Sequence, residues 1–153
     1  MPNFWDRLKA AFSETPEAER PAPEIAVGAL LLEAARADDD VADGEVMTAR
    51  AAIASFFDVE DGEAERILAE AERARADAAD IVRFTREAKT AYDTAGRTRL
   101  IEAVWRVVLA DDETTPDEDA YVRRLAGLLH VTDQDRGAAR RRVLAAGAAS
   151  PSR

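Results

Sequence analysis

Two short acidic segments hold the residues of this chain that are best suited to binding chemistry. Residues 38–45 contain five Asp or Glu and no base, and residues 111–119 contain six and no base. The other 20 acids are balanced by 21 Lys and Arg, so these segments account for the net charge of −10. Clustered carboxylates are the usual ligands of Ca²⁺, Mg²⁺ and Mn²⁺. The pattern indicates a binding site for one of these divalent cations. We expect no organic cofactor.

The two segments repeat one pattern. The sequence ADDDVADGE (37–45) aligns with ADDETTPDE (110–118) at a constant offset of 73, and Arg50 and Arg123 also match in the stretches that follow. Each copy comprises an apolar helix, an acidic turn and an amphipathic helix. We predict a composite metal site, formed if packing brings the two turns together. Its predicted ligands are Asp38, Glu45, Asp111 and Glu118.

Helix stability is a second explanation for half of this site. Thr115 to Glu118 reads Thr-Pro-Asp-Glu, a capping box with proline at the first helical position. Glu45 falls in a first turn, where the helix dipole favours an anion. Asp38 and Asp111 instead follow the carbonyl end of a helix, where an acid is disfavoured by about 0.3–1 kcal/mol. A bound cation would offset that cost, and a solvated acidic surface is the competing interpretation.

Other chemistry is poorly supported. Aligning Gly44 with the glycine of an EF-hand loop puts Val41 at a ligand position and Arg50 where a bidentate Glu is required. The chain has no Cys and a single His, His130, so a catalytic triad could be built only on that residue. The serines fall in a linker, a helix and the C-terminal tail. We therefore expect no enzymatic activity.

Composition favours one globular domain. The chain has 153 residues, of which 47% are hydrophobic and 34% charged. No apolar run approaches the roughly 20 residues that span a bilayer. Charged residues interrupt the apolar N-terminus, unlike a signal peptide, so we expect a cytoplasmic protein. The negative charge argues against nucleic acid as a partner.

Apolar residues recur with a 3.6-residue period throughout the chain and never alternate as in a strand, which predicts an all-α bundle of about seven to eight helices. Gly28 and neighbouring alanines would let another backbone approach the first buried helix closely. The predicted helices of the main body are Ile25–Ala37, Asp43–Phe57, one starting near Asp61, Ala79–Tyr92, Leu100–Ala110, Thr115–Leu129 and Asp133–Leu144, the last capped by Thr132.

The N-terminal segment is set apart by a Pro-rich linker. We predict an amphipathic helix and linker over 1–24, the helical domain over 25–145 and a flexible tail over 146–153. The first helix would present an apolar face for packing on the bundle, docking on a protein partner or resting on a membrane surface. That face is formed by Phe4, Trp5, Leu8 and Phe12.

A basic patch lies near the C-terminus. We expect its arginines to complement the carbonyl end of the last helix and to pair with neighbouring acids. The patch consists of Arg136, Arg140, Arg141 and Arg142.

These motifs resemble the TerB family, in its stand-alone bacterial branch. The shared features are a helix that ends in Ala-Asp, an acidic turn and a Glu seven residues after the Asp, present twice, together with the stretch Phe84–Glu113. The resemblance covers about Ile25–Leu144 and implies a compact helical bundle, metal binding by the acidic positions, and a link to stress and tellurite resistance. Asp39 and Asp112 stand where the family usually has glycine.

The family also occurs beside DnaJ-type domains, but Val131 follows His130, so this chain lacks the His-Pro-Asp of such a domain. Two functions remain open: a metal-binding stress module, and an adaptor whose acidic patch docks a protein partner without metal.

Overall fold

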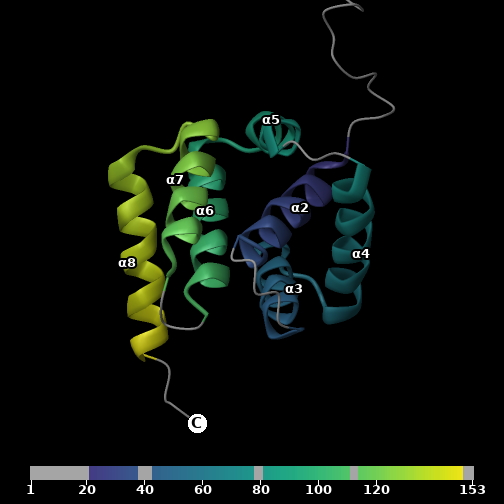
Figure 1. Ribbon diagram of the computed structural model, residues 1–153, viewed down its shortest axis with the longest axis horizontal. Helices are drawn as coiled ribbons and strands as arrows, with labels where there is room; N and C mark the ends of the chain where they lie inside the picture. Colours follow the sequence, from purple (N-terminus) through teal and green to yellow (C-terminus); the bar gives the residue numbers. More distant parts are fainter. Residues whose placement is uncertain (1–20, 38–42, 78–80, 111–113, 150–153) are drawn as a thin grey trace, which may run out of the picture.

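The chain is a bundle of helices (Figure 1). The computed structural model describes residues 21–37, 43–77, 81–110 and 114–149. These ranges contain seven helices and no strand, which confirms the predicted all-α class. The helices are α2 (Pro23–Ala35), α3 (Asp43–Phe57), α4 (Asp61–Asp77), α5 (Ile81–Ala91), α6 (Thr94–Val108), α7 (Pro116–Leu128) and α8 (Asp133–Ala149). The predicted helix over Met1–Phe12 lies outside the described residues.

Helix α2 is the central element. Pro23 stands in its first turn, where a missing N–H costs nothing, and apolar residues cover nearly all of its faces. The helix packs against α3, α4, α5, α6 and α7. A Cβ added at Gly28 would lie 3.1 Å from both the Ala71 Cβ and the Ile67 Cγ2 of α4. The predicted close approach at Gly28 is thus confirmed, and the helix that makes it is α4.

Helix α6 is the second largely buried helix and contacts α2, α3, α7 and α8. It was predicted to begin at Leu100 but begins at Thr94, because the Asp93 side chain accepts a 2.8 Å hydrogen bond from the N–H of Gly96 and caps the helix. Trp105 is buried and its Nε1 donates to the Arg136 carbonyl of α8 at 3.1 Å. This bond joins α6 to α8.

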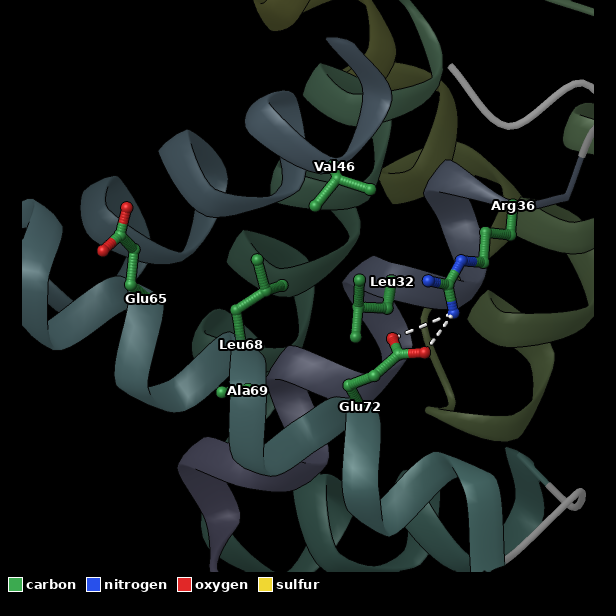
Figure 2. A pocket seen from close by; sticks show the side chains of 7 residues that line it. All are labelled: Leu32, Arg36, Val46, Glu65, Leu68, Ala69 and Glu72. Atoms are coloured by element: carbon green, nitrogen blue, oxygen red, sulfur yellow. Dashed lines mark hydrogen bonds and ion pairs between the residues drawn. The ribbon is translucent and has the colours of Figure 1, made fainter. Parts of the chain in front are cut away.

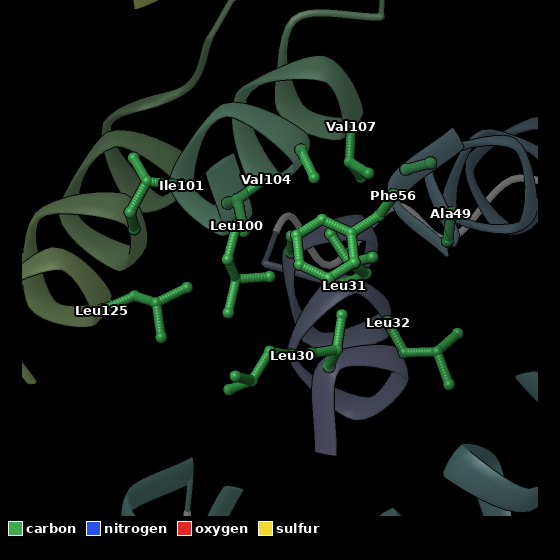
Figure 3. Close-up of a cluster of buried hydrophobic side chains, with 14 of the residues drawn as sticks. Leu30, Leu31, Leu32, Ala49, Phe56, Leu100, Ile101, Val104, Val107 and Leu125 are labelled. Atoms are coloured by element: carbon green, nitrogen blue, oxygen red, sulfur yellow. The ribbon is translucent and has the colours of Figure 1, made fainter. Parts of the chain in front are cut away.

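The core lies where the two central helices meet. Figure 3 shows Leu30 and Leu31 of α2 among Phe56 of α3, Leu100 of α6 and Leu125 of α7. Burial of each large apolar side chain contributes about 1.5–3 kcal/mol before chain entropy is counted. The core therefore joins both copies of the sequence repeat.

The repeat is longer than the acidic pattern indicates. Asp58, after α3, and His130, after α7, both have left-handed backbone, with φ of 53° and 58°. The N–H of Val59 donates to the Ala54 carbonyl at 3.0 Å, and that of Val131 donates to the Ala126 carbonyl at 2.8 Å. These are the six-to-one bonds of a Schellman helix end.

The second helix of each copy therefore ends in the same way and leads into a third helix of 17 residues, α4 or α8. The unit α2–α3–α4 thus corresponds to α6–α7–α8, and Figure 1 shows the two units side by side with α5 between them at one end. The offset shortens from 73 to 72 within α7, since Ala126 and His130 correspond to Ala54 and Asp58.

The basic patch is not at a helix end as predicted. Helix α8 continues to Ala149, beyond the predicted end at Leu144, so Arg140–Arg142 lie in its interior and no basic residue stands in its last turn. The expected pairing with acids is confirmed for two of the arginines: Arg136 contacts Asp133 at 2.7 Å, and Arg142 contacts Glu102 at 3.2 Å. Arg142 therefore joins α8 to α6, whereas Arg136 pairs within α8.

Candidate functional site

One of the four predicted metal ligands can be placed with its side chain. Asp38 and Asp111 lie outside the described residues, as does the side chain of Glu45 in the first turn of α3. Glu118 stands in the first turn of α7 and is partly buried. The composite site therefore stays a prediction, and Glu118 is its one described ligand.

Glu118 has a structural task. Its Oε1 accepts a 2.9 Å hydrogen bond from the N–H of Thr115, and its own N–H donates to the Thr115 hydroxyl oxygen at 3.1 Å. This reciprocal pair is the capping box predicted from the sequence. A carboxylate has about four lone-pair positions, so one such bond leaves Glu118 able to accept further partners.

No metal cluster occurs among the residues whose side chains are described: no group of three or more His, Cys, Asp or Glu there could hold an ion. The acidic residues outside that set include those of 38–45 and 111–113. These are the segments that the sequence pattern selects.

The helices around the acidic turns are equivalent in the two copies. Helices α2 and α6 end at Ala35 and Val108, and the helices after the turns begin at Asp43 and Pro116, each pair related by the same offset of 73. Both turns therefore follow the carbonyl end of a central helix, where the helix dipole adds negative potential.

The arginines nearest to the acidic runs pair with other carboxylates. Arg36 contacts Glu72 of α4 at 2.9 Å, and Arg106 contacts Glu102 at 3.2 Å. After the turns, Arg50 contacts Glu65 of α4 at 2.7 Å. The equivalent of Arg50 in the second copy behaves differently, because Arg123 contacts Asp119 within α7 at 3.2 Å.

A groove in the described part of the chain is lined by residues close in sequence to the first acidic turn (Figure 2). It is formed by α2, α3 and α4 and has a volume of about 410 Å³. Two of its residues flank the turn in sequence: Arg36 precedes it and Val46 follows it. The remaining lining residues are Leu32, Glu65, Leu68, Ala69 and Glu72. Val46 and Leu68 are only half-buried, because the crossing of three helices leaves this space between them.

A second, polar pocket of about 310 Å³ lies between α3 and α6. Arg99 lies over the Phe56 ring at 5.0 Å and donates to the Phe56 carbonyl at 3.1 Å. Glu102 in the same pocket pairs with Arg106 and Arg142. The charged groups of this pocket thus hold helices together.

Two of the residues considered for catalysis lie on the surface of the described part of the chain. His130 is exposed in the left-handed position that ends α7, and Ser55 is exposed on α3. None of the helices in the described part of the chain is long and apolar enough to cross a bilayer.

Comparison with known proteins gives the same family as the acidic pattern. The family model described as tellurite resistance protein TerB matches residues 24–141. Comparisons with curated proteins and with solved structures gave no match. The match covers more than half of the chain, from the first turn of α2 into α8, and includes both acidic runs, so the chain belongs to the TerB family.

Proposed function

We propose that this protein is a non-enzymatic TerB-family module of the cytoplasm that binds a divalent cation, Ca²⁺, Mg²⁺ or Mn²⁺, through its two acidic turns. Asp38 and Glu45 from one turn, with Asp111 and Glu118 from the other, are the proposed ligands. Membership of a family described by tellurite resistance supports a stress or tellurite-resistance context.

The observation that carries this proposal is the pairing of the nearest arginines. Arg36, Arg50 and Arg106 contact carboxylates outside the two acidic runs, and Arg123 contacts only the last acid of the second run among the described residues. These arginines thus have carboxylate partners other than the four proposed ligands, which supports a cation from solution as the partner of the turns. A divalent cation satisfies clustered carboxylates at close range better than side chains held elsewhere can.

The alternative function is a protein-interaction adaptor that docks a basic partner on the acidic turns. The capping box favours it in one respect, because Glu118 already has a structural role without any ion. The exposed first turn of α7, which includes Asp117, would extend such a surface. The two functions differ in ion specificity, since a docking surface responds only to ionic strength.

The test is thermal unfolding of EDTA-treated protein with each divalent cation added at constant ionic strength. A ligand of the native state at 100 times its dissociation constant stabilises by about 2.7 kcal/mol. For a chain of this size that is a rise in Tm of about 5–10 °C. The Asp38→Asn/Asp111→Asn double variant should lose the rise.

A second variant separates the helix-capping role of Glu118 from its proposed role as a metal ligand. Glu118→Gln keeps the capping box, which accepts Gln at this position, but removes the charge. We expect it to keep the Tm of the metal-free protein and lose most of the metal response. Glu63→Gln, in the first turn of α4, is the matched control and should respond like the parent. If no ion raises the Tm of the parent, the adaptor function replaces the metal function.

A further inference from the structure

The groove between α2, α3 and α4 combines an apolar surface with a charged rim, which includes Arg36, Glu65 and Glu72. Leu32, Val46, Leu68 and Ala69 supply the apolar surface. Glu65 and Glu72 stand on the rim with side chains that are 61% and 47% exposed. Met47, beside Val46 on α3, is also exposed. Apolar surface of this kind beside charged residues is typical of a docking site.

We propose that residues 1–12 of the same chain form a helix that docks into this groove. The apolar face of that segment, with Phe4, Trp5, Leu8 and Phe12, has the side chains that such a groove accepts. At about 410 Å³ the groove holds one or two large side chains rather than a whole helix. Trp5 is the expected anchor, since a buried aromatic residue dominates contacts of this size.

The linker is long enough for this contact. Leu32 lies nine residues after Pro23, about 14 Å along α2 at the helical rise. Residues 13–22 form a linker of ten residues that can span up to ~33 Å. Tethering also gives the segment a high effective concentration at the groove, which favours it over an untethered partner or a second copy.

Charge complements shape at this site. On a helical wheel Arg7 and Lys9 flank the two sides of the apolar face of residues 1–12. The groove presents Glu65, which pairs with Arg50, and Glu72, which pairs with Arg36 and, at 3.7 Å, with Arg75. A carboxylate accepts more than one donor, so a docked helix could add Arg7 and Lys9 to these pairs.

Fluorescence tests the proposal in the full chain, which has two tryptophans, Trp5 and the buried Trp105. The spectrum of the parent minus that of Trp5→Phe isolates Trp5. We expect Trp5 to emit at shorter wavelength than a solvent-exposed indole and to be quenched several-fold less by acrylamide. Ala69→Glu, at an exposed groove position, should abolish both effects. Ala145→Glu, on the exposed face of α8, should change neither.

Two results of that experiment would overturn the proposal: a solvent-like Trp5 in the parent, or a protected Trp5 that Ala69→Glu leaves unchanged. Cross-linking then identifies the occupant, because the chain has no Cys of its own. A short bismaleimide should join Ala11→Cys to Ala69→Cys within one monomer, and should not join Ala11→Cys to Ala145→Cys. A covalent dimer would show docking on a second copy and contradict docking within the chain.

Discussion

At the residue scale, Tyr121 is a polar side chain that joins the two repeat units. It stands on α7, and its hydroxyl donates a 2.7 Å hydrogen bond to the Leu30 carbonyl of the central helix α2. Burial raises the pKa of Tyr121, and the negative charge of Glu33 acts in the same direction. The phenol therefore keeps its proton in the folded state at pH values where a free tyrosine ionises.

Tyr121→Phe should lower the free energy of unfolding by about 0.5–1.5 kcal/mol at pH 7, since it removes one hydrogen bond. The raised pKa also predicts a pH dependence. Stability from this group is fully present below the unfolded-state pKa of about 10 and is lost as the pH rises above it. Above that pKa, the contribution of Tyr121 to the free energy of unfolding falls by up to about 1.4 kcal/mol per pH unit. Urea unfolding between roughly pH 8 and pH 11.5 measures this pH dependence of the free energy of unfolding. The Tyr121→Phe variant should show a weaker pH dependence.

Tyr92 provides the comparison, because burial also raises its pKa. Tyr92→Phe should remove a smaller part of the slope and leave the Tyr121 contribution intact. Equal slopes in the parent and in Tyr121→Phe would show that Tyr121 does not control the alkaline stability.

At the element scale, the contact between α2 and α4 depends on a glycine. Gly28 lets the two helices approach so closely that an added Cβ would meet Ile67 and Ala71 at 3.1 Å. Both neighbours are buried and cannot move into solvent. Glycine costs helix stability of roughly 1 kcal/mol relative to alanine, so its place in the centre of α2 is explained by packing.

Gly28→Leu should therefore destabilise the protein by about 1–3 kcal/mol or more, because the added side chain overpacks a dense core. The measurement is chemical denaturation followed by circular dichroism. Gly127→Leu is the matched control: Gly127 lies in α7 with open space around the position of its missing Cβ. That change should stabilise by about 0.5–1 kcal/mol through helix propensity. A tolerated Gly28→Leu would mean that α4 can move away from α2 at little cost.

At the scale of the whole molecule, the two repeat units share one core. Helix α2 of the first unit contacts α6 and α7 of the second, and α3 also packs against α6. Phe56 of α3 is buried beside the apolar face of α6. Neither unit can therefore bury its apolar surface without the other.

We expect a single cooperative unfolding transition for the full chain. Circular dichroism follows all helices, and fluorescence of Trp105 in a Trp5→Phe background follows α6 in the second unit. The two denaturation curves should coincide, as they do for two-state domains. Separate midpoints would show that the units unfold independently, against the shared core.

The sequence by itself determined the local features of this protein, because these depend on residues three or four positions apart. The helical period predicted the all-α class, and the Thr115 capping box follows from cap chemistry. The twofold acidic pattern predicted the family. It also named the candidate metal ligands, of which Glu118 alone has a described side chain, and that side chain caps a helix.

Tertiary structure decided which distant residues meet. No local pattern pairs Arg36 with Glu72, brings Gly28 against Ala71 or joins Tyr121 to the Leu30 carbonyl. The groove likewise exists only because α2, α3 and α4 cross at one place. Such contacts depend on how whole helices pack their faces, and a one-dimensional period specifies the face of each helix but not the neighbour it meets.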